Sequence, residues 1–138
     1  MNNYVYDELE IGHIESFSVE INEKMMELFR LITNDINPLH TDLDYAKDYG
    51  YEKNVVYGML TASFFSTLAG VYLPGKYSLI HCVEIDFIKP VYSGNKLIVR
   101  GTVKEKNDLF KTIALKVEIY TTEGIKVCRG KMRIGLLK

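Results

Sequence analysis

The sequence is poor in several features that would set it apart from an ordinary globular domain. Its 138 residues include no tryptophan, three prolines and two cysteines, and the net charge is −1. Without an excess of Lys and Arg over Asp and Glu, the chain lacks the charge that neutralises nucleic-acid phosphates. No apolar run approaches the roughly 18 residues that a membrane helix needs. We therefore expect neither a nucleic-acid-binding protein nor a membrane-spanning one.

Cysteine usage argues against a metal or disulfide framework. Cys82 and Cys128 are far apart, and neither belongs to a CxxC pair or to a Cys/His ligand spacing. This pattern predicts two reduced thiols and no zinc site. The first residues contain no basic segment followed by an apolar stretch, so no signal peptide is expected. The predicted compartment is the cytoplasm.

The fractions of hydrophobic and charged residues are typical of one folded domain. Hydrophobic residues make up 47% of the chain and charged residues 25%, which excludes a disordered chain. The length matches a prior of roughly 100–200 residues per domain. No linker, internal repeat or low-complexity segment interrupts the sequence. We therefore predict a single domain over residues 1–138.

The first half of the chain predicts helices. An amphipathic helix is expected over residues 22–34, because apolar residues recur at helical spacing, at Ile21, Met25, Leu28, Phe29 and Ile32. Residues 35–40 are expected to form a loop, since proline disfavours the helical conformation in the residue before it. A short helix over 43–49 follows. Residues 58–69 carry no charge, and a helix that is apolar all round is expected to be buried.

The second half predicts an antiparallel sheet. Polar and apolar residues alternate there, as is typical of strands with one buried face. The expected strands are residues 78–88, 96–105, 111–121 and 125–137, with a weaker edge strand at 11–18. Helices that precede hairpin-connected strands indicate the α+β class. We expect the sheet to curl around the uncharged helix.

A carboxylate and an imidazole lie on the short predicted loop. Asp35 and His40 are separated by turn-forming residues, of which Asn37 and Pro38 should stiffen the loop. Two such side chains held close together can act as general acid and general base toward one water molecule. The spacing alone leaves a simpler alternative open, in which Asp35 only ends a helix and His40 is a surface residue.

Gly58 stands where the uncharged helix is expected to begin. The first N–H groups of a helix lack partners and lie at its positive end. A glycine there lets a substrate oxygen approach the backbone, so that the N–H can stabilise developing negative charge. The alternative is that Gly58 only lets the chain turn into the helix.

Together these segments resemble the MaoC-like, (R)-specific enoyl-CoA hydratases. The resemblance rests on four segments in the same order, namely residues 31–40, 55–63, 73–78 and 87–95. It implies a hot-dog fold, a curved antiparallel sheet wrapped around a long central helix. It also implies a homodimer joined through edge strands, with active sites near the subunit interface. The implied activity is a hydro-lyase reaction, the reversible addition of water to trans-2-enoyl-CoA to give (R)-3-hydroxyacyl-CoA, without metal or redox cofactor.

The resemblance also implies roles for individual residues. Asp35 and His40 match the catalytic pair, and the Gly58 N–H matches the oxyanion donor. Ser66 matches a serine of the central helix that supports the site, and Asn37 matches a residue that shapes the loop. The residues beside the oxyanion glycine that we expect to contact substrate are Tyr57, Met59 and Leu60.

Two positions depart from the family pattern. Asn34 stands where glycine often precedes the aspartate, and Tyr57 stands where histidine usually precedes the oxyanion glycine. Asparagine adopts left-handed backbone angles more readily than most residues, so we expect the loop conformation to be retained. Tyrosine in place of histidine is expected to affect contacts to the acyl or pantetheine group and not the backbone donor, which is the Gly58 N–H.

Other functions of the same fold stay open at this point. An acyl-carrier-protein dehydratase would run the same reaction in the opposite direction. A hot-dog acyl-CoA thioesterase is disfavoured, because those enzymes usually carry a carboxylate on the central helix and residues 58–69 have none. A non-catalytic acyl-thioester-binding module would not need the Asp35–His40 pair. Asp35 is the simpler base at neutral pH, where a carboxylate is ionised.

Overall fold

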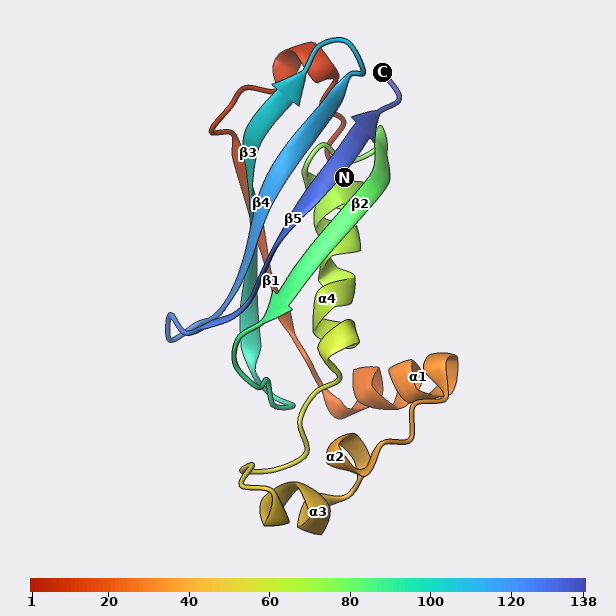
Figure 1. Ribbon diagram of the computed structural model, residues 1–138, viewed down its shortest axis with the longest axis vertical. Helices are drawn as coiled ribbons and strands as arrows, with labels where there is room; N and C mark the ends of the chain where they lie inside the picture. Colours follow the sequence, from red (N-terminus) through yellow and green to blue (C-terminus); the bar gives the residue numbers. More distant parts are fainter.

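A five-stranded antiparallel sheet curves around one helix in the computed structural model, which describes residues 1–138 (Figure 1). The strands are β1 (Ile14–Glu20), β2 (Ser78–Phe87), β3 (Lys96–Asn107), β4 (Thr112–Thr121) and β5 (Lys126–Leu136). Their order is β1-β3-β4-β5-β2, so β1 and β2 form the two edges. The four strands predicted for the second half are confirmed, with ends that agree to within two residues.

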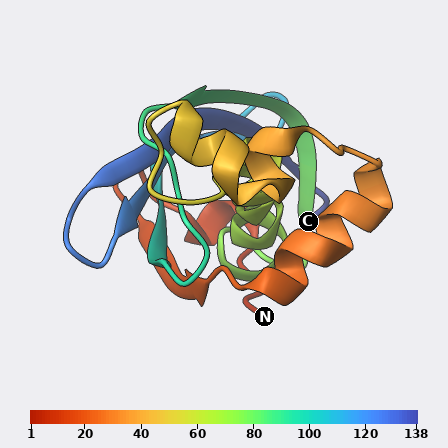
Figure 2. The ribbon, with the colours of Figure 1, turned by 90° about the horizontal axis from the view of Figure 1, so that it is seen from below.

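The helices fall into one central element and a group at one end of the sheet. They are α1 (Glu23–Thr33), α2 (Pro38–Thr41), α3 (Leu43–Asp48) and α4 (Gly58–Thr67), and α4 continues into a π-helical turn (Leu68–Tyr72). Figure 2 shows the sheet curving around α4, with α1, α2 and α3 lying across its lower end. The predicted starts of the helices agree with the structure, and α4 begins at Gly58 as expected.

The loop expected over residues 35–40 is wrong for its second half. Residues Pro38–Thr41 form the short helix α2, which Asn37 caps by accepting a hydrogen bond from the Leu39 N–H at 2.9 Å. Proline blocks the helical conformation only in its predecessor, and in the first turn of a helix it needs no N–H donor. Pro38 therefore starts a helix here as well as ending one.

The sheet and α4 share one hydrophobic core. Alternate residues of β3 and β4, among them Leu97, Val99 and Ile119, are fully buried against the helix. Glycines in the sheet let the helix come close. A Cβ on Gly130 would lie 2.8 Å from the Phe65 ring and 2.1 Å from a backbone oxygen of β2. Any larger residue there would push α4 and β2 apart.

The prediction that the central helix is buried all round is wrong for one face. Met59 is 62% exposed, and Ser63 and Ser66 are exposed on the same side of α4. The predicted apolar stripe of α1 is also partly uncovered, since Ile32 is 82% exposed. The face of α4 is uncovered because the sheet ends at the edge strand β2 and covers only part of the circumference of this helix.

None of the helices combines the length and the apolar character that crossing a bilayer would require. Cys82 and Cys128 are unpaired, as the sequence predicts. Burial raises the pKa of the Cys128 thiol to about 11, so this thiol stays protonated at neutral pH.

Candidate active site

The turn after α1 places the Asp35 carboxylate. Helix α1 ends at Thr33, and its C-cap residue Asn34 has φ 56° and ψ 27° and so adopts the left-handed conformation expected from its family position. The Asp35 N–H donates to Thr33 Oγ1 at 3.3 Å, and Asp35 Oδ1 accepts from the Asn37 N–H at 3.1 Å. One carboxylate oxygen therefore holds the turn, and Oδ2 makes no hydrogen bond within the chain.

Helix α2 carries His40 and determines which ring nitrogen is free. His40 Nδ1 lies 2.7 Å from the carbonyl oxygen of Val55. A carbonyl oxygen can only accept, so Nδ1 carries the hydrogen and Nε2 of the neutral ring is the proton-free nitrogen. Neutral His40 thus offers Nε2 as a hydrogen-bond acceptor.

The start of α4 leaves backbone donors without partners. The N-cap residue Tyr57 provides no side-chain cap, and the N–H groups of Gly58 and Met59 make no hydrogen bond within the chain. The ring of Phe87 lies against Gly58, where an added Cβ would be 3.2 Å from it. Two free N–H groups at the positive end of a helix favour a negatively charged oxygen.

One open cavity of about 960 Å³ brings these groups together. Asp35, His40, Tyr57 and Gly58 all line it, together with Met59, Ser63 and Ser66 from the exposed face of α4. The volume falls within the range of roughly 300–1,000 Å³ that is typical of small-molecule sites. The residues that carry the carboxylate, the imidazole and the free amide therefore line the same space. The uncovered face of α4 is one wall of the candidate site.

The remaining predicted residues, Leu60, Ser66 and Asn37, lie in different places, and Ser63 shares the exposed face of α4 with Ser66. Leu60 is 9% exposed and belongs to the hydrophobic core, because two positions along a helix turn it away from Gly58 toward the sheet. Ser63 Oγ donates to the Leu60 carbonyl at 2.6 Å and is satisfied by its own helix. Ser66 makes no hydrogen bond within the chain and is free for substrate or water. Asn37 stays outside the cavity and shapes the turn.

The opposite wall of the cavity comes from residues that sequence patterns did not indicate. Ile80, Val83 and Phe87 of β2 line it, and Phe29 of α1 lines it as well. Thr61 has a buried hydroxyl without a partner and lines a second cavity of about 260 Å³, which also touches His40 and Gly58. The spacing of residues in the sequence could not indicate the contribution of β2, because this strand lies about 40 residues after the Asp35 turn.

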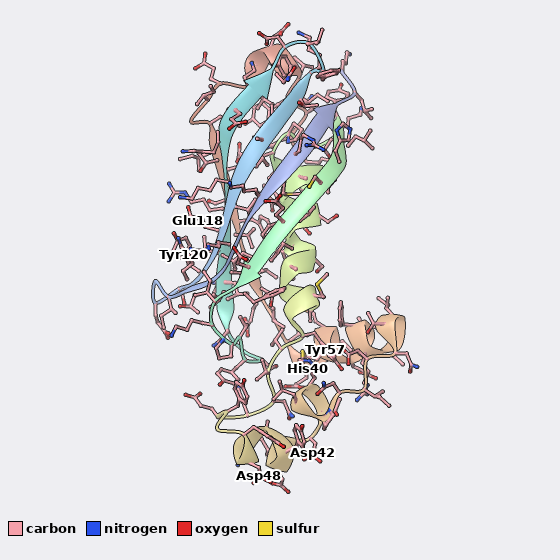
Figure 3. The ribbon with its side chains drawn as sticks, in the orientation of Figure 1. His40, Asp42, Asp48, Tyr57, Glu118 and Tyr120 are labelled. Atoms are coloured by element: carbon pink, nitrogen blue, oxygen red, sulfur yellow. The ribbon has the colours of Figure 1, made fainter.

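Glu118, the carboxylate with the strongest pKa shift, lies away from the cavity. Burial alone would raise the pKa of Glu118, but hydrogen bonds from Lys126 and Tyr120 and the charge of Lys116 hold it at about 2. Figure 3 shows Glu118 and Tyr120 on the sheet, away from His40 and Tyr57. This carboxylate serves an ion-pair network on β4 and β5 and does not line the cavity. No three His, Cys, Asp or Glu side chains cluster as metal ligands.

Known proteins share both the sequence and the fold. The chain matches the MaoC like domain over residues 12–125. It is 30% identical over 128 residues to the (R)-specific enoyl-CoA hydratase of Aeromonas caviae, which covers 93% of this chain and 96% of that protein. The solved (R)-hydratase from A. caviae has a TM-score of 0.88, with 30% identity and coverage of 93% and 97%. An R-hydratase from Pseudomonas aeruginosa has a TM-score of 0.91, with 28% identity and coverage of 97% and 86%. The chain therefore belongs to the MaoC-like domain family and has its hot-dog fold.

Proposed function

We propose that the protein is an (R)-specific enoyl-CoA hydratase, which adds water reversibly to trans-2-enoyl-CoA and gives (R)-3-hydroxyacyl-CoA. The observation that carries this proposal is the shared cavity of Asp35, His40 and the unpartnered Gly58 N–H. The similarity to a named (R)-specific hydratase over nearly the whole chain supports it. The absence of a carboxylate on α4 disfavours the thioesterase alternative.

The two side chains suit the binding of one water molecule. Ionised Asp35 offers Oδ2, and neutral His40 offers Nε2, so the site presents two acceptors. A water that donates one hydrogen to each acceptor turns an oxygen lone pair toward C3 of the enoyl group. One acceptor then takes the proton as the C3–O bond forms. With the hydrogen on Nδ1, His40 can also take this proton, at Nε2.

The backbone donors act on the thioester. Its carbonyl oxygen accepts a hydrogen bond from the Gly58 N–H, so the C2–C3 π electrons move toward the carbonyl as water attacks. The enolate then collapses and C2 takes up the proton that water gave to the acid–base pair. Both atoms are added from one face, which gives syn addition. No net oxidation or reduction occurs and a backbone N–H polarises the carbonyl, so the proposed reaction needs neither a redox cofactor nor a metal.

The decisive assay measures the loss of enoyl-thioester absorbance with purified protein and crotonyl-CoA, followed by chiral analysis of the product. We expect an (R)-3-hydroxyacyl-CoA. A series of enoyl-CoAs of graded length defines the acyl preference, and matched enoyl-acyl carrier protein substrates identify the carrier. Release of free coenzyme A would instead indicate a thioesterase. Binding of crotonyl-CoA without turnover would indicate a non-catalytic module.

We also propose that the protein is a homodimer in which a second copy covers the open side of the cavity. The edge strand β2 exposes Leu79, Ile80, Val83 and Phe87, and Met59 of α4 is exposed beside them. Unpaired backbone groups and apolar side chains on an edge strand favour pairing with another strand. Antiparallel pairing of β2 with the β2 of a second copy would extend the sheet and bury this surface. The unpaired cysteines support a cytoplasmic location for this dimer.

Replacing Val83 with lysine should convert the dimer to a monomer. The charge would lie in the middle of the β2 edge, where it cannot be buried without a partner. Light scattering coupled to gel filtration should give about twice the 15.9 kDa chain mass for the wild type and 15.9 kDa for the variant. Ile11→Lys is the matched control, because Ile11 is 67% exposed and lies outside β2. A monomeric wild type would contradict the proposal.

A further inference from the structure

Tyr57 ties the Asp35 turn to the rest of the protein. The side chain is 2% exposed and its hydroxyl donates to the main-chain oxygen of Asp35 at 2.9 Å. Every other hydrogen bond of residues 34–37 stays within residues 29–41. The bond from the Tyr57 hydroxyl is therefore the only hydrogen bond that links this exposed turn to a distant segment. Burial and the nearby Asp35 charge raise the pKa of Tyr57, so the hydroxyl keeps its proton and stays a donor.

The ring of Tyr57 also holds the second member of the pair. It packs against the His40 imidazole with ring centroids 4.2 Å apart and planes at 32°. The ring of Phe29 contacts it as well, with centroids 5.0 Å apart. Figure 3 shows Tyr57 and His40 together below the N-terminal end of α4. With Nδ1 bound to the Val55 carbonyl, this ring contact leaves the imidazole little freedom to rotate.

One residue thus contacts two parts of the candidate site and adjoins the third in the chain. Tyr57 binds the backbone that carries Asp35, packs on His40, and is followed in the chain by Gly58. We propose that Tyr57 is a positioning residue, whose hydroxyl and ring together keep the Asp35 carboxylate and the His40 imidazole at the separation that one water molecule requires. This inference rests on the proposed hydratase function, and it assigns Tyr57 no contact with the reacting atoms.

Tyr57→Phe tests the hydroxyl, because it keeps the ring and removes only the hydrogen bond to Asp35. We expect kcat for enoyl-CoA hydration to fall by about 10–100-fold, as for other groups that orient a catalytic residue, with KM little changed. Tyr72→Phe is the matched control. The Tyr72 ring is half-buried and stacks on Phe17 at 4.6 Å, and its hydroxyl makes no hydrogen bond within the chain. An unchanged kcat in Tyr57→Phe would overturn the proposal.

A double-mutant cycle distinguishes positioning from a general loss of stability. If Tyr57 acts through Asp35, adding Tyr57→Phe to Asp35→Asn should lower kcat by much less than it does in the wild type. If the loss of kcat in the double variant equals the product of the two single losses, Tyr57 acts independently of Asp35, which would contradict the inference.

A measurement without substrate keeps the inference testable if the protein proves not to be a hydratase. The backbone ¹⁵N order parameters of Asp35, Ile36 and Asn37 should fall in Tyr57→Phe, from the rigid value of about 0.85 toward about 0.6, and stay unchanged in Tyr72→Phe. A wild type that does not hydrate enoyl-CoAs would refute the proposed function alone. Order parameters that do not change in Tyr57→Phe would refute the positioning role whatever the activity.

Discussion

Replacing Asp35 with asparagine is expected to lower kcat for enoyl-CoA hydration by about 10²–10⁴-fold, the usual loss for an acid–base group. The amide has nearly the same shape as the carboxylate but cannot take a proton from water. Its oxygen can still accept the Asn37 N–H that Asp35 Oδ1 binds at 3.1 Å, so the turn should persist. Steady-state kinetics with crotonyl-CoA, together with thermal unfolding, measure the two effects separately.

Asp42→Asn is a closely matched control for this variant. Asp42 Oδ1 accepts from the Tyr45 N–H at 3.0 Å and caps α3, which is the same kind of local bond, and Asp42 does not line the cavity. We expect its kcat to match that of the wild type. A folded Asp35→Asn protein with a near-normal hydration rate would remove Asp35 from the proposed mechanism.

Replacing Gly58 with proline should lower kcat by about 10²–10³-fold, because it removes the N–H proposed to bind the thioester oxygen. The position tolerates proline better than most. Gly58 is the first residue of α4, where the N–H has no partner in the chain, and Tyr57 already has the ψ of 122° that a residue before proline adopts. The measurement is kcat with crotonyl-CoA, with circular dichroism to confirm the fold.

Gly58→Ala separates the lost N–H from the added bulk. Alanine keeps the donor but places a Cβ 3.2 Å from the Phe87 ring, as proline also does. The difference in kcat between the two variants therefore reports the loss of the N–H together with the ring carbon that replaces it, without the contribution of the shared Cβ. Equal losses in both would mean that crowding against Phe87, and not the missing donor, explains the effect.

Local sequence patterns predicted most of the elements and indicated the candidate site residues. Periodicity identified α1 and the four strands of the second half, and the lack of charge identified α4. Asp35 and His40 lie five residues apart, and Gly58 was expected at a helix start, so spacing and residue type made them candidates, and the family resemblance assigned their roles. These features are local, because backbone preferences and side-chain periodicity act over a few residues.

The errors arose where packing at a distance decides. The pattern of α4 could not show that the sheet ends at β2 and leaves Met59 and Ser66 uncovered. The choice between Leu60 in the core and Met59 in the cavity depends on how α4 is rotated against the sheet. The missed helical turn at Pro38 is a local exception, because Asn37 caps it from the adjacent position.

The sequence by itself determined the α+β class, the family resemblance and the identity of the carboxylate, the imidazole and the glycine. Only the tertiary structure showed that these three residues line one cavity, that His40 Nε2 is the free nitrogen, and that Tyr57 binds the Asp35 turn. The physical reason is that each of these facts depends on contacts between segments far apart in the chain. Residue type and spacing specify what a side chain can do, whereas the packing of α1, α2, α4 and β2 specifies what it meets.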